Sequence, residues 1–271
     1  MIEQFVKEAL AEDIGRGDLY ALVEPSVDAS AKIIAKSDGV VAGQKYVDVL
    51  CKLQKIAVQW HKQDTERFVK GDIITEFQAS SHALLSSERT ILDLLLHASS
   101  IATLTRKYVD IIKPYGVKLL DTRKTRPLLR VFEKYATRTG GAVNHRMGLD
   151  DSLMLKDTHL KTIKDLKEYV SRAREQIPFT AKIEVEAESL EMVRIACEAD
   201  VDIIMCDNMT PQQVSEVVAY RDANYPHILL EASGNISLET IESYAKTGVD
   251  AISSGSLIHQ ANWIDLSMKI D

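Results

Sequence analysis

The sequence has few cysteines, and none of them is spaced as a metal-binding or redox pair. Cys51, Cys197 and Cys206 lie far apart, and no CxxC pair occurs. This usage is typical of reduced, mostly buried cysteines in a cytosolic protein. Long apolar runs are also missing: no stretch of about 18 apolar residues occurs, so we expect no transmembrane helix.

The N-terminus lacks the features of a signal peptide. Residues 1–18, MIEQFVKEALAEDIGRGD, are acidic and amphipathic, without a basic start or a continuous apolar core. We therefore predict a cytoplasmic protein that has no membrane partner. Excess positive charge is missing as well, since the net charge is −7 over 271 residues. A general nucleic-acid binder draws its affinity from an excess of Lys and Arg, so we expect no nucleic-acid partner.

One stretch departs from this acidic background. Between Arg123 and Arg146 the chain holds seven Lys or Arg and one acid, Glu133, a local net charge of +6. A solvated basic helix face is the ordinary explanation of such a run. Here, however, Arg123 follows the apolar run 117–120 and Arg146 follows a glycine pair, so these cations lie at the ends of predicted elements. Because α/β folds build their sites at such ends, the stretch indicates a pocket for a small polyanion.

The first part of the chain has the pattern of an α+β module. A length of 271 residues, 45% of them hydrophobic and 27% charged, allows one large globular domain or two ordinary ones. Short strands are predicted between residues 31 and 77, and their short connections favour antiparallel pairing. Residues 87–113 then show the apolar spacing of a buried helix, which Pro114 ends. This helix is the predicted junction between the two halves.

After Pro114, short apolar runs alternate with helical patterns. The predicted strands are 117–120, 153–155, 181–185, 203–206, 228–230 and 251–252, and the predicted helices are 127–138, 161–176, 189–199, 211–221 and 238–246. Thr210, Pro211 and Gln213 form a start signal for one helix, and Ser237 is placed to cap the last. Repeated strand–helix units imply parallel strands, in either an open doubly wound sheet or a barrel.

The strand ends favour the barrel. Each apolar run finishes in polar residues: Asp121–Lys124, Lys156-Asp157, Glu186, Asp207-Asn208, Glu231 with Ser233–Asn235, and Ser253–Ser256. In an open sheet only the strands at the switch point contribute to a site, whereas all strand ends of a barrel reach one mouth. Because six strands are fewer than the usual eight, we predict a small or incomplete α/β barrel.

Cations suited to anion binding lie at this mouth. The candidates are Arg123, Lys124, Arg146 and Lys156. A guanidinium can bind two carboxylate or phosphate oxygens at once, and a lysine adds a compact point charge. Structural ion pairs with Glu133 or Asp150 are the alternative, and His145 is an even choice between a structural and a binding role. The intervening helix also carries Arg130, Lys134 and Arg138, which could be solvated charges with no part in the site.

Two carboxylates and two glycine loops complete the candidate site. Glu186 and Asp207 could hold Mg²⁺, accept sugar hydroxyls or simply neutralise the pocket. Glu184 faces the same side of its strand as Glu186 and is a weaker candidate. Ser233–Asn235 and Ser254–Ser256 each follow a strand and precede a helical segment. Their small residues let backbone N–H groups approach a phosphate closely, which predicts a phosphate site.

Motifs along nearly the whole chain resemble one enzyme family. They are LLDTRKTRP, GGAVNHRMGLDDSLMLKD, IEVEAE, IIMCDN, EASGNI and SSGSLIH, together with EDIGRGD and SSERTILDLLLHASSIAT. In this order they resemble the decarboxylating quinolinate phosphoribosyltransferases, type II phosphoribosyltransferases that are also called nicotinate-nucleotide pyrophosphorylases. The segment from Asp121 to Asp157 is highly specific, whereas the glycine loops alone would be weak signals.

The resemblance implies a two-domain enzyme of NAD biosynthesis. The implied domains are an N-terminal α+β open sandwich at residues 1–100, joined by the C-terminal tail 261–271, and an incomplete six- or seven-stranded α/β barrel at 101–260. The implied reaction converts quinolinate and phosphoribosyl pyrophosphate to nicotinate mononucleotide, pyrophosphate and CO₂, with Mg²⁺ and no organic cofactor. The implied assembly is a homodimer or hexamer, in which Arg89 reaches the neighbouring subunit's site.

The resemblance also implies a role for each site residue. Quinolinate would be bound by Arg89, Thr122, Arg123, His145, Arg146 and Lys156. The phosphoribosyl group and its phosphate would be bound by Lys124, Ser233, Gly234, Asn235, Ser254, Gly255, Ser256 and His259. Lys124, Glu186 and Asp207 would be catalytic. Glu186 and Asp207 would also meet the metal, either directly or through water or substrate.

Four positions depart from the family pattern, among them Thr158, where an Asn is frequent, and Tyr20, where a Thr is frequent. Arg126 and Leu128 stand where a Thr and a Gly are common, which puts the shape of the turn into helix 127–138 in question; Arg126 could add to the anion field. Two rival functions remain: a paralogous phosphoribosyltransferase for nicotinate or for a pyridine-like acid associated with molybdenum transport, and a non-catalytic sensor of phosphorylated metabolites. The motif around Asn144 favours the quinolinate enzyme.

Overall fold

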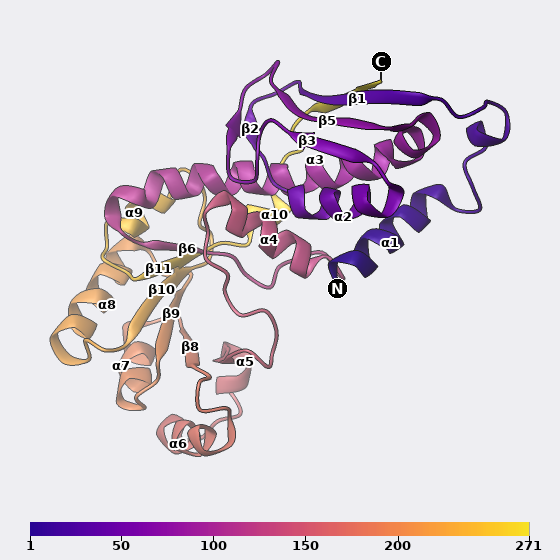
Figure 1. Ribbon diagram of the computed structural model, residues 1–271. Helices are drawn as coiled ribbons and strands as arrows, with labels where there is room; N and C mark the ends of the chain where they lie inside the picture. Colours follow the sequence, from indigo (N-terminus) through magenta and orange to yellow (C-terminus); the bar gives the residue numbers. More distant parts are fainter. Residues whose placement is uncertain (271) are drawn as a thin grey trace. The chain divides into compact units, whose positions relative to one another are not determined.

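The computed structural model describes residues 1–270, and the chain divides into two compact units. The first comprises Met1–Arg106, Tyr135–Gly141 and the C-terminal segment from Ala261, and the second comprises Lys107–Lys134 and Ala142–Gln260. Each unit combines helices and strands (Figure 1). Within the described residues, no helix is long and apolar enough to cross a membrane.

The first unit is built on an antiparallel sheet. Its strands follow the order β12 (Leu266–Ile270), β1 (Asp28–Ala35), β5 (Ile73–Ser80) and β3 (Ala57–Trp60). Every pairing in it is antiparallel, which confirms the pairing predicted from the short connections. The C-terminal strand β12 is aligned with β1, where Met268 lies opposite Ile33. A second, two-stranded sheet pairs β2 (Gly39–Val40) with β4 (Arg67–Phe68).

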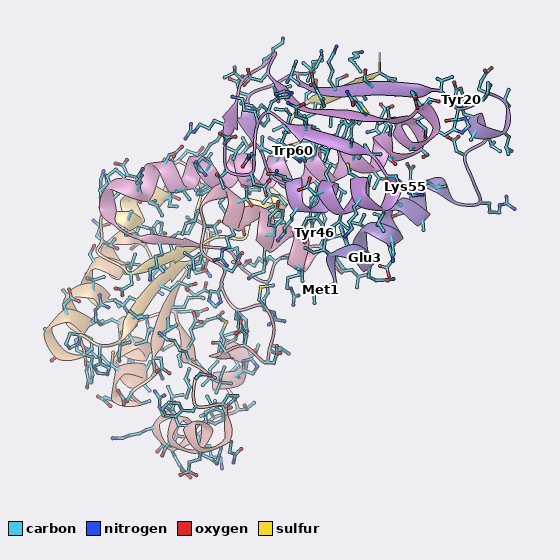
Figure 2. The ribbon with its side chains drawn as sticks, in the orientation of Figure 1. Met1, Glu3, Tyr20, Tyr46, Lys55 and Trp60 are labelled. Atoms are coloured by element: carbon cyan, nitrogen blue, oxygen red, sulfur yellow. The ribbon has the colours of Figure 1, made fainter. Side chains whose placement is uncertain are left out.

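Alternation along the strands gives this sheet a buried and an exposed face. From Ala31 onward, β1 buries every second residue, as expected for a strand with one face on the core. Helices α1 (Ile2–Ile14) and α2 (Gln44–Gln54) pack together. The rings of Phe5 and Tyr46 meet edge to face with centroids 5.6 Å apart, and Figure 2 labels Tyr46. This geometry is a favourable one for aromatic pairs.

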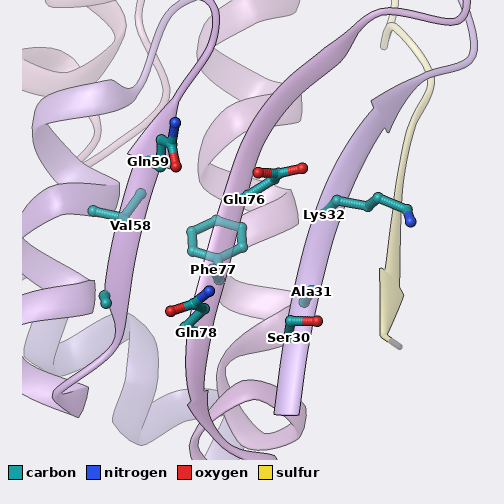
Figure 3. Close-up of a pocket in the computed structure, with 9 residues that line it drawn as sticks. Ser30, Ala31, Lys32, Val58, Gln59, Glu76, Phe77 and Gln78 are labelled. Atoms are coloured by element: carbon teal, nitrogen blue, oxygen red, sulfur yellow. The ribbon is translucent and has the colours of Figure 1, made fainter.

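The exposed face of the sheet is hollowed by a cavity of about 400 Å³. Side chains of β1, β3 and β5 line it, among them Lys32, Gln59, Glu76 and Gln78 (Figure 3). Lys32 lies directly opposite Glu76 in the strand register, so their charges compensate each other. Its glutamines are neutral, and the charges of Lys32 and Glu76 cancel. This cavity therefore lacks the positive field that the sequence predicts for the active site.

The helix predicted at 87–113 is α3 (Ser81–Ile112), which begins earlier than predicted. Ser81 directly follows β5, its N–H donates to the Val27 carbonyl at 2.7 Å, and its Oγ accepts the Val27 N–H at 3.2 Å. These bonds satisfy polar groups at the helix start, so the helix can begin within a polar segment that the apolar pattern does not mark. The end of the helix before Pro114 is confirmed.

The second unit contains a six-stranded parallel sheet. In sheet order the strands are β6 (Lys118–Leu120), β11 (Ala251–Ser253), β10 (Leu229–Ser233), β9 (Ile203–Asp207), β8 (Ile183–Ala187) and β7 (Leu153–Leu155). Of these six strands, β6 is the first along the chain and β11 is the last. They pair with each other, as the first and last strands of a closed barrel do. Among the described strands β6 and β7 are not paired, so the barrel stays open there. The prediction of an incomplete α/β barrel is confirmed.

Helices alternate with these strands, and Figure 1 shows α7 and α8 along one face of the sheet. They are α4 (Arg130–Gly140), α5 (Asp157–Leu160), α6 (Leu166–Gln176), α7 (Leu190–Glu198), α8 (Pro211–Asn224), α9 (Ile241–Ala245) and α10 (Ser256–His259). The start signal of α8 is confirmed, because Thr210 and Gln213 each accept the other's backbone N–H. The predicted Ser237 cap is wrong: α9 begins after Thr240, and Ser237 closes a preceding turn through its carbonyl.

Two predicted helix starts are too early for a local reason. The helix predicted at 127–138 begins at Arg130, and the one predicted at 161–176 begins at Leu166. Leu128 has a left-handed backbone, with a φ of 64°, which interrupts a right-handed helix. Asp165 caps α6 by accepting the N–H of Glu168 at 2.9 Å. Backbone conformation therefore sets the start of α4, and cap chemistry sets the start of α6.

The exposed residue Leu128 gives a stability prediction. Its side chain is 99% exposed, and its φ of 64° is strained for any residue with a Cβ. We expect Leu128→Gly to raise the free energy of unfolding by about 1 kcal/mol, because glycine adopts this conformation without the steric cost. Urea unfolding measures the difference. Leu149→Gly, at an exposed position without positive φ, is the control, and an equal gain there would contradict the explanation.

Candidate active site

The strand register determines which side chains share the interior of the barrel. Glu186 on β8 and Glu231 on β10 both lie beside Met205 on β9. Two residues further along the strands, Asp207 lies beside Ser233. Because successive strand residues point to opposite faces, these positions form layers on one face of the sheet, and the last layer lies at the carboxyl ends of the strands.

A cavity of about 500 Å³ lies at this end of the barrel. The predicted site residues that line it are Thr122, Arg123, Lys124, His145, Arg146, Lys156, Glu186, Asp207, Ser233, Gly234 and Asn235. Met154, Met205, Asn208 and Ser253 line it as well and were not predicted as site residues. Met154 and Met205 bring apolar, polarisable surface, which suits contact with a flat aromatic ring.

A second cavity, of about 340 Å³, shares part of this lining. Its further predicted residues are Ser254, Gly255, Ser256 and His259. Thr122, Lys124 and the loop Ser233–Asn235 line both cavities. Lys124 therefore stands where the two cavities meet. Arg89 belongs to the first unit, on α3, where its Nη1 lies 3.3 Å from Asp93 Oδ1.

The two guanidinium groups of the first cavity differ in their partners. Arg146 is buried: its Nη1 donates to the Ser152 carbonyl at 2.9 Å, and its Nη2 contacts Met154 Sδ at 3.5 Å. Burial, and then the charge of Arg123, lower the pKa of Arg146. In Arg123 the buried Nε has no hydrogen-bond partner among residues 1–270. A buried donor without an acceptor costs free energy, so this atom indicates a place for an acceptor from a ligand.

The carboxylates at the strand ends lie close enough to affect each other. Lys156 Nζ is paired with Glu186. Burial, and then the charge of Glu186, raise the pKa of Asp207. Asp207 Oδ2 accepts a hydrogen bond from Asn208 Nδ2 at 2.9 Å. Since two carboxylates repel, a divalent cation or sugar hydroxyls placed against them would stabilise their charged forms.

His145 is held by two buried carboxylates. Its Nε2 lies 3.2 Å from Glu184 Oε2 and 3.4 Å from Glu231 Oε2. Its Nδ1 accepts the backbone N–H of Arg146 at 2.7 Å. Both ring nitrogens are thus engaged by the protein itself. Glu184, the weaker candidate on the strand of Glu186, thus belongs to this cluster, and so does Glu231, which the sequence marked only as a polar strand end; both are almost fully buried.

In the part of the chain that the structure describes, His145, Glu184 and Glu231 are the one group of three or more His, Cys, Asp or Glu side chains whose ligand atoms lie close enough together to hold a metal ion. A metal-binding imidazole nitrogen must offer a lone pair, and the other ring nitrogen ordinarily donates a hydrogen bond. In His145 the other nitrogen accepts one instead, so Nε2 carries the proton. The group therefore fits a protonated pair with carboxylates better than a metal centre.

Lys134 is not solvated charge, so that interpretation is wrong. Its side chain is 1% exposed, and Nζ lies 2.6 Å from Asp121 Oδ1. Of the other cations on α4, Arg130 donates to the Met147 carbonyl at 3.0 Å, whereas Arg138 is exposed. One member of the basic helix run therefore belongs to the interior of the second unit, beside the cation-bearing loops.

Comparison with known proteins identifies the family. The model of the quinolinate phosphoribosyl transferase N-terminal domain matches residues 18–99, and that of the C-terminal domain matches residues 101–269. The chain belongs to the quinolinate phosphoribosyltransferase family. It is 39% identical to the probable nicotinate-nucleotide pyrophosphorylase [carboxylating] of Synechocystis sp. over 274 residues, covering 100% of this chain and 92% of that protein.

Two further relatives agree. The probable nicotinate-nucleotide pyrophosphorylase [carboxylating] of Bacillus subtilis is 39% identical over 272 residues, covering 99% of this chain and 93% of that protein. The structure of the nicotinate-nucleotide pyrophosphorylase from Francisella tularensis matches with a TM-score of 0.94 at 34% identity, covering 100% of this chain and 96% of that one. The likeness to this quinolinate phosphoribosyltransferase family thus extends over both units.

The departure from the family pattern at Arg126 has a local structural explanation. Arg126 Nη1 lies 2.7 Å from Glu133 Oε1, and the Arg126 N–H donates to Glu133 Oε2 at 2.8 Å. Glu133 is fully buried, so it needs this charge-assisted pairing. The suggestion that Arg126 adds to the anion field is therefore not supported. The sequence allowed Glu133 as an ion-pair partner of the candidate cations at the barrel mouth, but Glu133 pairs with Arg126 instead.

The glycines of the two loops permit close approaches. Gly234 has a φ of 87°, and a Cβ there would lie 2.8 Å from the backbone nitrogen of Asn208. At Gly255 a Cβ would lie 2.8 Å from Lys124 Cδ. Glycine is required at Gly234 for both reasons, whereas at Gly255 it leaves room for the Lys124 side chain.

The serine hydroxyls of these loops are used within the protein. Ser253 Oγ donates to Ser233 Oγ at 3.0 Å and joins the ends of β11 and β10. Ser254 Oγ and Ser256 Oγ are 2.7 Å apart, and both also bond to the Ile236 carbonyl. The N–H groups of Ser254 and Ser256 are engaged as well, with the Leu120 carbonyl and with Ser254 Oγ. Among the described residues of this loop, the Gly255 N–H is therefore the donor offered to a phosphate.

Proposed function

We propose that the chain is a decarboxylating quinolinate phosphoribosyltransferase, which converts quinolinate and phosphoribosyl pyrophosphate to nicotinate mononucleotide, pyrophosphate and CO₂ in NAD biosynthesis. Family membership and the names of the relatives support this reaction. The observation of the site that carries the proposal is the buried, unpartnered Nε of Arg123, in a cavity that Arg146 and Lys156 also line. Three cations from separate loops suit a compact dicarboxylate.

In this proposal the first cavity binds quinolinate. Arg123 and Arg146 bind its two carboxylates, and Lys156 contributes charge from the carboxyl end of β7. Met154 and Met205 contact the faces of the pyridine ring. His145 contributes as part of the cavity wall, since its two nitrogens are already engaged by the protein.

The second cavity binds the phosphoribosyl part of the other substrate. The Gly255 N–H and backbone N–H groups of the loop Ser233–Asn235 would face the 5-phosphate, and His259 also lines that cavity. Lys124 lines both cavities and so lies between the pyridine ring and the phosphoribosyl group. Its ammonium would offset the negative charge that develops on the departing pyrophosphate.

Glu186 and Asp207 have the donor chemistry of a Mg²⁺ site. Hard oxygen ligands are the ones that Mg²⁺ binds, and it commonly keeps water and substrate phosphates among its ligands. The raised pKa of Asp207 beside Glu186 supports the fit, because a divalent cation would relieve this repulsion. When bound, Mg²⁺ would neutralise charge on the pyrophosphate.

The remaining chemistry follows from positioning and fixed charge. The pyridine nitrogen forms a bond to the anomeric carbon while the carbon–oxygen bond to pyrophosphate breaks, and the electron pair leaves with pyrophosphate. Glu186 and Asp207 stabilise the positive charge that develops on the ribose ring. The N-ribosylated ring is cationic, so it can accept the electron pair left when the carboxylate next to nitrogen departs as CO₂; the ring carbon then takes up a proton.

The direct test uses quinolinate labelled with ¹³C in the carboxylate next to nitrogen. With phosphoribosyl pyrophosphate and Mg²⁺ we expect one labelled CO₂ and one pyrophosphate for each nicotinate mononucleotide. Consumption of nicotinate without CO₂ release from quinolinate would instead show the rival phosphoribosyltransferase. Binding of the substrates with no turnover would show a metabolite sensor.

We also propose a cytoplasmic homo-oligomer, a dimer or hexamer, in which Arg89 completes the neighbouring subunit's site. The Arg89 side chain is 58% exposed and pairs with the exposed Asp93 on the same helix, and such an exposed pair holds a side chain weakly. Arg89→Ala and Lys124→Ala are each expected to be inactive alone. Refolded together they should regain activity, since some mixed sites are intact.

Measurement of nicotinate mononucleotide formation decides this. Lys124→Ala refolded by itself is the control and should stay inactive. If the mixture also stays inactive while size-exclusion chromatography shows mixed oligomers, Arg89 acts in its own subunit or not at all.

A further inference from the structure

We propose that Lys134 and Asp121 are positioning residues that align the two loops carrying the substrate-binding cations. These loops are 121–124, after β6, and 144–146, after the chain leaves α4. The proposal rests on the proposed function, because it assigns to this pair the ordering of the quinolinate site. Neither residue lines either cavity, so both act through other groups.

The ammonium of Lys134 joins the two loops directly. Its Nζ lies 2.6 Å from Asp121 Oδ1 and donates to the carbonyls of His145 at 2.8 Å and Arg146 at 3.1 Å. The carbonyl of Thr122 lies 3.4 Å away. One group thus binds backbone atoms next to Arg123 and at Arg146, whose guanidinium groups face the proposed dicarboxylate.

Asp121 closes the connection from the other side. Its Oδ1 accepts the backbone N–H of His145 at 2.8 Å, and its Oδ2 accepts Asn144 Nδ2 at 2.6 Å. The same Asn144 amide donates to the backbone carbonyl of Lys134 at 2.8 Å. Strand end, helix and second loop are therefore joined in a closed network, and a shift of one loop must break bonds to the other.

Stability alone is a weak explanation of this pair. Lys134 and Asp121 are 1% and 0% exposed, so both charges lost their hydration on folding. Replacing a buried ion pair by uncharged residues is often neutral for stability, whereas the directional bonds of the pair are lost. Burial lowers the pKa of Lys134 while Asp121 opposes that shift, which agrees with a charge held for its geometry. Active sites need that precision, since a displacement of about 1 Å can cost roughly 10²-fold in rate.

A positioning role predicts a selective effect. The bonds of Lys134 and Asp121 go to the loops 121–124 and 144–146. Loop 144–146 lines the first cavity alone, whereas Thr122 and Lys124 line both cavities. The loop Ser254–Ser256 is held by its own hydroxyl bonds and by the carbonyls of Ile236 and Leu120. Loss of the pair should therefore weaken quinolinate binding much more than binding at the phosphate side.

The experiment compares Lys134→Met with the charge-neutral double variant Lys134→Met/Asp121→Asn, in the full chain. Arg138→Met, a cation on the exposed side of the same helix, is the matched control. We expect the dissociation constant for quinolinate to rise roughly tenfold or more in both Lys134 variants, and that for ribose 5-phosphate to change by less than about twofold. The double variant should regain thermal stability lost in Lys134→Met without regaining quinolinate binding.

Hydrogen exchange gives a readout that needs no substrate. Amides of 121–124 and 144–146 should exchange faster together in both Lys134 variants and stay unchanged in Arg138→Met. Unchanged exchange in either loop, or recovery of quinolinate binding along with stability in the double variant, overturns the positioning role. If the unaltered protein neither binds nor converts quinolinate, the proposed function fails, and the exchange data still decide whether the pair orders the loops.

Discussion

Lys124→Ala is expected to lower kcat by about 10²–10³-fold while the dissociation constant for quinolinate stays within about threefold. Lys124 lines both cavities, so in the proposed reaction its charge would lie where the bond to pyrophosphate breaks rather than at the carboxylates. An interaction made mainly in the transition state affects turnover more than substrate binding. Steady-state formation of nicotinate mononucleotide and calorimetric titration with quinolinate measure the two quantities.

The control is Lys118→Ala, which removes a lysine from the amino end of the same strand, β6. It should leave both quantities unchanged. Full activity of Lys124→Ala would remove Lys124 from the catalytic machinery. A loss of quinolinate binding as large as the loss of turnover would move its role to the first cavity.

Asp207→Asn is expected to lower kcat by a similar factor, about 10²–10³-fold, and to raise the Mg²⁺ concentration needed for half-maximal rate. Asp207 ends β9, and the charge of Glu186 acts on it, so in the proposed reaction its carboxylate would stabilise both the ribose ring in the transition state and the cation. Its raised pKa means that the carboxylate takes up a proton at a higher pH than an ordinary aspartate. Activity should therefore fall on the acid side as the pH drops through that pKa, and this acid limb should disappear in the variant.

Glu191→Gln is the matched control for Asp207. It removes an exposed carboxylate in the first turn of α7 that lies outside the cavity lining. Rate measurements against pH and Mg²⁺ concentration should give the same profiles for this variant and the unaltered protein. If Asp207→Asn keeps its rate and its Mg²⁺ requirement, neither the catalytic role nor the metal role holds.

The barrel and its mouth could be predicted because their signals are local. A short apolar run followed by polar residues marks a strand end, and six such runs separated by helical patterns leave few topologies. The structure brings Arg123, Arg146, Glu186 and Asp207 into one cavity lining, as expected if these ends share one mouth. Motif order then pointed to the family, which the comparisons show.

Element boundaries were less predictable, because backbone and cap chemistry set them. Helix α4 starts late where Leu128 adopts a left-handed conformation, and α6 starts at the Asp165 cap. The Ser237 cap failed for the same reason, since a turn closed at Thr240 separates it from the helix. Apolar spacing reports the packed face of a helix and says little about its first turn.

The basic stretch 121–159 by itself determined that this acidic protein holds a cationic site at the ends of barrel strands, and its motifs determined the family. Only the tertiary structure decided which charged side chains line the cavity and which pair with other residues inside the protein. It pairs Lys134 with Asp121 in the interior, gives Arg126 to Glu133, and sets Glu184 and Glu231 against His145. Burial and pairing depend on distances between residues far apart in the chain. The sequence around a charged residue therefore does not show whether that residue is buried or which residue it pairs with.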